Sequence, residues 1–179
     1  RGLCRSGSPE PLINLPGGEA YIVPYEGERT GDPSRTFGRI PVAEGADGAR
    51  LVVARNRIEQ VEGDGALADR YRALFERDAA RRNVAELGLG CNDRAVVSGS
   101  VLEDEKVGLH WAYGRSDHLG GVVGTGDFGD PEHVVHQDLV YAHGCPIVAA
   151  EVILYPAAGP GRIIQRDGAY VEDLFKQHG

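Results

Sequence analysis

The sequence predicts an α+β fold class: an antiparallel-rich, barrel-like β domain with one main helix at about residues 65–82. Short apolar runs are repeatedly separated by turns that contain Gly, Pro or Asn. A single segment has clear helical periodicity, and strands do not alternate with helices as they do in βαβ units. The length of 179 residues suits one domain, which we expect to span residues 1–179.

The expected elements begin with an irregular segment at residues 1–13, where Gly, Ser and Pro are frequent. The run 20–23, which Pro24 terminates, predicts a buried strand. Three stretches joined by short turns predict an antiparallel meander, at residues 39–43, 50–54 and 57–61. Further strands are expected at residues 84–87, 95–97, 107–113, 138–142, 147–154 and 162–165, and a last short helix at residues 172–177.

The main helix is predicted by apolar side chains that recur on one helical face. These side chains are Leu67, Tyr71, Leu74 and Phe75, at positions i, i+4, i+7 and i+8. Asp64 stands where a residue would cap the helix N-terminus.

Composition excludes several classes of partner. The 27 acidic and 19 basic residues give a formal net charge of −8, so a phosphate-binding surface would need strong local segregation of Lys and Arg. We therefore expect no nucleic-acid partner. Because no apolar run approaches the roughly 20 residues that span a bilayer, we expect no membrane partner either. Cys4, Cys91 and Cys145 are scattered and odd in number, which favours a reducing compartment such as the cytoplasm.

The histidines are unevenly distributed, since five of the six lie between residues 110 and 143. In an extended segment His136 and Asp138 point to the same face, because side chains alternate along a strand. With His110 they have the composition of a two-histidine, one-carboxylate metal site. Glu19 and Glu86 stand in apolar surroundings, and a buried carboxylate is costly unless a cation or a metal pairs with it.

Five motifs occur in a fixed order along the chain: NLPGGE at residues 14–19, AELGLG at 85–90, LEDEK at 102–106, His110 with Gly114, and HQD at 136–138. Together they resemble the M29 family of metal-dependent aminopeptidases, of the aminopeptidase T type. The resemblance runs from about residue 12 to 170. It covers the C-terminal catalytic domain of that family and none of its N-terminal domain.

The resemblance implies a binuclear site that holds two divalent ions, such as zinc, cobalt, manganese or magnesium. The family's metal ligands fall on Glu19, Glu86, His110, His136 and Asp138. Three converging carboxylates would leave one negative charge with one divalent ion and one positive charge with two, which a bridging hydroxide would cancel. Two ions therefore fit better, and such a pair can activate water against a scissile carbonyl.

The remaining positions of the expected site are less well defined. A family tyrosine ligand falls on Asp117, with His118 beside it, so either side chain could take its place. Glu105 is a candidate general base or orienting group, and Lys106 could hold a carboxylate or an oxyanion. The expected protein is thus a cytoplasmic, homodimeric aminopeptidase-like hydrolase that acts on a peptide or small-molecule substrate.

Two alternatives remain open. Some relatives in the same superfamily resemble ring-cleaving dioxygenases, in which one Fe(II) would be held by His110, His136 and Asp138. A non-catalytic metal-binding or scaffold domain is the other, since the family's N-terminal domain could be needed to close the cleft.

Overall fold

The structure describes residues 17–171 in this computed structural model, and this part of the chain contains ten strands and two α-helices. The strands are β1 Glu19–Ile22, β2 Phe37–Glu44, β3 Asp47–Ala54, β4 Arg57–Glu62, β5 Val84–Gly90, β6 Leu109–Gly114, β7 His136–Val140, β8 Glu151–Leu154, β9 Arg162–Arg166 and β10 Ala169–Tyr170. The helices are α1 Ala66–Arg77 and α2 Val101–Asp104, with 3₁₀ turns at Ala79–Arg82, Asp117–Leu119, Thr125–Asp127 and Pro131–His133. The segment expected at residues 1–13, Cys4 and the short helix expected at residues 172–177 lie outside the described residues.

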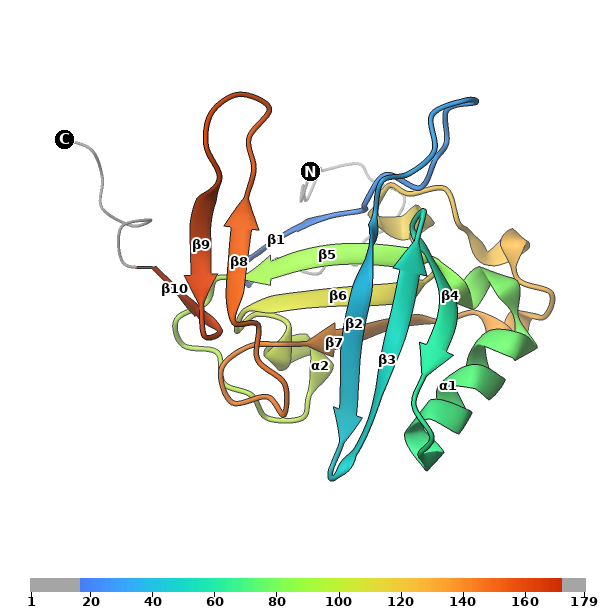
Figure 1. Ribbon diagram of the computed structural model, residues 1–179, viewed down its shortest axis with the longest axis horizontal. Helices are drawn as coiled ribbons and strands as arrows, with labels where there is room; N and C mark the ends of the chain where they lie inside the picture. The colour runs from blue at the N-terminus through green and yellow to red at the C-terminus, as the bar shows by residue number, and fades with distance from the viewer. Residues whose placement is uncertain (1–16, 172–179) are drawn as a thin grey trace, which may run out of the picture.

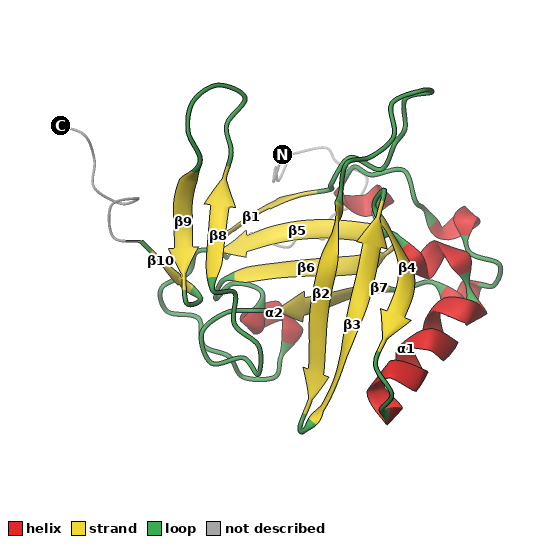
Figure 2. Ribbon diagram, in the orientation of Figure 1, coloured by secondary structure: helices red, strands yellow, loops and turns green. Residues whose placement is uncertain are grey.

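The strands form three antiparallel sheets, as Figure 2 shows. The central sheet has the order β1-β5-β6-β7, the meander has the order β2-β3-β4, and a smaller sheet has the order β10-β9-β8. The predicted fold class is therefore confirmed, including the antiparallel meander. The sheets do not close on themselves, so the term barrel-like describes them only loosely.

The hydrophobic core lies on one face of the central sheet. In Figure 1 the meander crosses in front of β5 and β6, with α1 beside it. Trp111 and Tyr113 of β6 point into this core, where they join residues of the meander and Phe75 of α1. Because side chains alternate along a strand, His110 and Ala112 of β6 point to the opposite face. The core thus fixes which face of the sheet carries the polar residues.

The main helix is shorter than predicted. It ends at Arg77, where Asp78 adopts an extended backbone, and Ala79–Arg82 follows as a 3₁₀ turn. The Asp78 side chain accepts a hydrogen bond from the Ala80 backbone N–H, so it begins the new turn rather than continuing the helix. The expected cap by Asp64 is wrong, because Asp47 of the meander accepts from the Leu67 N–H at 2.8 Å instead.

Three strand predictions need correction. The strand expected at residues 147–154 begins only at Glu151. Residues 20–23 were expected to be buried, but β1 is an edge strand and its Ile22 is 63% exposed. Residues 95–97 do not form a strand: the Val96 N–H donates to the Glu103 side chain, and the N–H groups of Ser98 and Gly99 donate to Asp104, so α2 holds this segment as a loop. Side chain to backbone bonds of this kind compete with strand pairing.

None of the described helices has the length and apolar composition that a membrane crossing requires. Cys91 and Cys145 are free thiols.

Candidate metal centre

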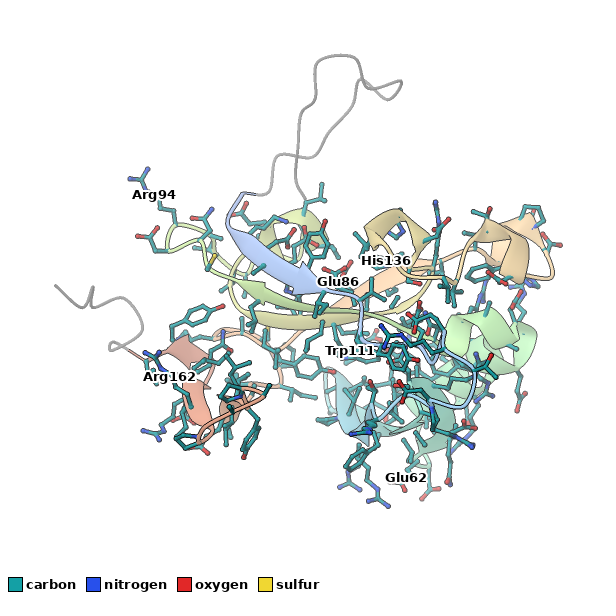
Figure 3. The ribbon with its side chains drawn as sticks, turned by 90° about the horizontal axis from the view of Figure 1, so that it is seen from above. Glu62, Glu86, Arg94, Trp111, His136 and Arg162 are labelled. Atoms are coloured by element: carbon teal, nitrogen blue, oxygen red, sulfur yellow. The ribbon has the colours of Figure 1, made fainter. Side chains whose placement is uncertain are left out.

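The second face of the central sheet carries most of the sequence-predicted ligands. Glu86 on β5 and Asp138 on β7 flank Ala112 of β6 in one cross-strand row, and directly opposed residues share a face. His136 is opposite Gly114, and His110 is opposite Gly88. In Figure 3, Glu86 and His136 lie near each other on one side of the sheet, and Trp111 lies on the other side. Register alone therefore brings residues from three strands together.

One group of possible metal ligands consists of Glu19, Glu105 and His110, whose ligand atoms lie within 4.8 Å of one another. Glu19 comes from the edge strand β1, and its Oε2 lies 3.7 Å from His110 Nε2. Glu105 follows α2 and is paired with Lys106. The Lys106 Nζ also lies 2.8 Å from Glu19 Oε1, so one ammonium orients both carboxylates.

The second group consists of Glu86, His136 and Asp138, again within 4.8 Å. His136 Nε2 lies 3.1 Å from Glu86 Oε2 and 3.6 Å from Asp138 Oδ1. The other oxygen of Glu86, Oε1, lies 3.5 Å from Nε2 of His110 in the first group. Glu86 therefore stands between the two groups and faces both.

Both histidines are oriented by backbone carbonyls. His136 Nδ1 lies 2.7 Å from the Arg115 carbonyl oxygen, and His110 Nδ1 lies 3.1 Å from that of Gly108. A carbonyl can only accept, so each Nδ1 must carry the hydrogen. This arrangement aims both Nε2 atoms at the carboxylates and is the usual way in which proteins orient a metal-binding imidazole.

The carboxylates and imidazoles of the two groups lie close enough together to shift one another's pKa values. Burial alone would raise the pKa of the Glu86 carboxyl, but the neighbouring His110 and His136 imidazoles outweigh it and lower that pKa to about 2. Burial would lower the pKa of His136, yet the neighbouring Asp138 and Glu86 carboxylates raise it to about 10. In the first group, burial raises the pKa of Glu105 despite its pairing with Lys106. The shifts of Glu86 and His136 indicate that the second group favours a positive charge beside its carboxylates.

Three observations show that the cluster suits divalent cations. Glu19 Oε2, His110 Nε2 and Asp138 Oδ1 are buried and have no hydrogen-bond partner among the described residues. Four carboxylates converge with a single ammonium, and uncompensated buried charge is unfavourable. The position opposite His110 is Gly88, where a Cβ atom would lie 1.9 Å from His110 Nε2, so the imidazole can take this place in the cluster only because residue 88 is glycine. The donors, carboxylate oxygens and imidazole nitrogens, are those that zinc and related ions accept.

Asp117 lies outside both groups of possible metal ligands. Its carboxylate pairs with Arg115 and accepts from the His118 N–H, and it is partly exposed on the 3₁₀ turn Asp117–Leu119. The expectation that Asp117 joins the ligands is therefore not met by this geometry. His118 lies closer to the site, since its ring meets that of His136 edge to face at 4.7 Å between centroids.

The glycines of β5 are the functional positions that sequence analysis missed. Gly88 and Gly90 follow Glu86 at intervals of two, so they stand on the ligand face, and a Cβ at Gly90 would meet the backbone of Glu105 and Lys106 at 2.3 Å. The pattern Glu-x-Gly-x-Gly in a strand was the available signal. It indicates a face on which another part of the chain approaches the strand closely, here the His110 imidazole and the backbone of Glu105 and Lys106.

Comparison with known proteins supports the fold. No protein-family model matches this chain, and no curated protein matches it. Among solved structures, wild-type AmpT from Thermus thermophilus is similar, with a TM-score of 0.56 and 19% sequence identity. The match covers 86% of this chain and 39% of the AmpT chain, so this chain spans well under half the length of that protein. At this identity the likeness shows a shared fold.

Proposed function

We propose that this chain is the metal-binding catalytic domain of an aminopeptidase-like hydrolase that removes N-terminal residues from peptides. The observation that carries the proposal is the pair of adjoining ligand groups, joined by Glu86 and containing buried ligand atoms without partners. The structural neighbour AmpT is an aminopeptidase, which supports the same reaction class.

In this proposal Glu19 and His110 hold one divalent ion, His136 and Asp138 hold a second, and Glu86 contributes to both. Divalent ions bound there would lower the pKa of a coordinated water and polarise a scissile carbonyl. The Gly108 and Arg115 carbonyls keep the two imidazoles oriented with Nε2 toward the ions, which would displace any proton on Nε2 when they bind.

Glu105 and Lys106 are assigned supporting roles in catalysis. Burial raises the pKa of Glu105, which suits a group that accepts a proton from water and returns it to the leaving amine. Lys106 holds the Glu19 and Glu105 carboxylates in place through its two ion pairs. Loss of either residue should reduce turnover more than metal content.

The decisive experiment is the metal content of the purified chain, combined with assays of peptide cleavage. We expect about two zinc, cobalt or manganese ions per chain and release of the N-terminal residue from short peptides. His136→Ala should abolish tight metal binding, whereas His143→Ala, which alters an exposed histidine outside both groups, should leave it unchanged. Unchanged metal content in the His136 variant would remove this site from consideration.

The same experiment separates the alternatives. One iron per chain with oxygen consumption would favour the ring-cleaving dioxygenase, which needs only His110, His136 and Asp138. Two bound ions without cleavage of any peptide would favour a metal-binding domain without activity of its own. The structural neighbour is more than twice as long, so a second domain could be required for activity.

The family resemblance also leads us to propose a cytoplasmic homodimer. Sedimentation of the purified chain should then give twice its mass of 19.2 kDa. A monomer at micromolar concentration would contradict this part of the proposal.

A further inference from the structure

A cavity of about 590 Å³ lies against the face of the central sheet opposite the metal cluster. It is bordered by α1 on one side and by β6 and β7 on the other, with Tyr113 and Leu139 on the sheet. Three arginines line it: Arg70 and Arg77 from α1, and Arg81 from the following 3₁₀ turn. None of the catalytic roles assigned above involves these side chains.

Arg81 is the unusual member of this group because it is only 6% exposed. Its Nε donates to the His133 carbonyl oxygen at 2.8 Å, and its two terminal nitrogens have no acceptor among residues 17–171. The neighbouring Arg82 shows the ordinary alternative, since its guanidinium donates to the carbonyls of Phe75 and Ile58. No Arg81 nitrogen is among the fully buried atoms without a partner, so its terminal nitrogens are accessible from the cavity that Arg81 lines, where an anion can reach them.

The charge around the cavity is not balanced by the described residues that line it. Arg70 is paired with Glu44, but Arg77 donates its Nε to His133 Nε2 at 2.9 Å, which satisfies a hydrogen bond without supplying a negative charge. Asp138 is the acidic residue among the lining positions of the described chain, and its side chain belongs to the metal cluster on the other face. Two positive charges therefore remain beside the cavity.

The other walls are largely apolar. Leu74 and Leu139 provide aliphatic surface, and the rings of Tyr71 and Tyr113 lie 6.4 Å apart between centroids. The Tyr113 side chain is 5% exposed, and its hydroxyl has no hydrogen-bond partner in the described part of the chain. A phenol in this position can donate a hydrogen bond to an anion.

We propose that this cavity binds a small oxyanion carried by an apolar group, either a carboxylate or a phosphate monoester, with Arg81 and Arg77 holding the oxyanion. A guanidinium matches the planar fork of either anion and forms paired hydrogen bonds with it. The aromatic and aliphatic walls then contact the apolar group. The site is separate from the proposed catalytic cluster, so the proposal does not depend on that function.

The test is isothermal titration calorimetry of the 179-residue chain, stripped of metal by a chelator so that anions cannot bind at the other face. Three probes are titrated in turn: phenyl phosphate, benzoate and inorganic phosphate. We expect phenyl phosphate or benzoate to bind at least about tenfold more tightly than inorganic phosphate, because only they reach the apolar walls. The tighter of the two identifies the anion class.

Three arginine variants test whether the probe binds in this cavity. Arg81→Gln should weaken the tighter probe by about tenfold or more, since a charge-assisted hydrogen bond is lost. Arg77→Gln changes a more exposed residue and should weaken it severalfold, which keeps the test informative if the Arg81 variant fails to fold. Arg39→Gln, an exposed arginine paired with Glu62 on the meander, is the matched control and should bind as the unmodified chain does.

Each contrary result overturns the proposal. Absence of binding by all three probes at millimolar concentration would show that the cavity is not an anion site. Equal affinity in the Arg77 variant, or equal affinity for inorganic phosphate, would show that the arginines or the apolar walls do not recognise the ligand. A His136→Ala chain should bind the probe normally, so failure of the metal centre leaves this test unaffected.

Discussion

Substitution of Gly88 by alanine tests the metal centre at the position where one methyl group has the largest effect. Gly88 of β5 lies opposite His110 of β6, and both face the ligand cluster. An added Cβ would lie 1.9 Å from His110 Nε2 and 2.3 Å from Cε1, whereas ordinary van der Waals contact begins at 3.4 Å. The methyl group thus overlaps the edge of the imidazole that carries the ligand atom.

The magnitude follows from how little His110 can move. Its side chain is fully buried, and its Nδ1 is tied to the Gly108 carbonyl at 3.1 Å. Overpacking at such a site costs about 1–3 kcal/mol of unfolding free energy. Displacement of a metal-binding imidazole should weaken metal affinity by about tenfold or more, by analogy with the loss of groups that orient such ligands.

The assay is metal titration of Gly88→Ala together with urea denaturation of the metal-free chain. Gly126→Ala is the matched control, because no heavy atom lies within 4 Å of its added Cβ and its backbone is not left-handed. We expect the control to match the unmodified chain in both measurements. If Gly88→Ala binds metal with undiminished affinity, the assignment of His110 Nε2 as a ligand is refuted.

Three further substitutions test the fold around the site. Asp47→Ala removes the acceptor of the Leu67 N–H at the start of α1 and should lower the unfolding free energy by about 1 kcal/mol, measured by urea denaturation. Phe75→Ala empties a position that is 1% exposed and should cost about 3–5 kcal/mol in the same measurement; a loss below 1 kcal/mol would mean that α1 does not pack as described. Asp78→Asn tests pH dependence: burial raises the pKa of Asp78, but hydrogen bonds from backbone N–H groups and from His133 outweigh it and lower that pKa. The ionised Asp78 carboxylate therefore stabilises the fold above its unfolded pKa of about 4, and this stabilisation is lost as the pH falls through the folded pKa. Urea denaturation curves of the variant and the unmodified chain should differ at pH 6 and converge in acid.

Much of the fold could be predicted because local patterns governed it. The meander follows from short turns between alternating stretches, and α1 from apolar residues at helical spacing. The failures occur where distant residues intervened. Asp47 of the meander, not Asp64, accepts from the Leu67 N–H, and the side chains of Glu103 and Asp104 hold residues 95–99 as a loop.

The candidate site shows the same division. The sequence by itself determined the chemistry: Glu19, Glu86, His110, His136 and Asp138 are the residue types that bind divalent ions, and alternation along each strand determined that His136 shares a face with Asp138. Only the tertiary structure decided which residues meet. Strand register placed Glu86 between the two histidines, and the loop after α2 added Glu105 to one group.

The tertiary structure also determined that Asp117 pairs with Arg115 and does not join the ligand cluster. The cavity beside Arg81 likewise depends on the packing of α1 against the sheet. The physical reason is the range of the forces involved. Backbone propensity and side-chain alternation act between residues a few positions apart, whereas burial and charge pairing depend on groups that only the folded chain brings within a few ångströms.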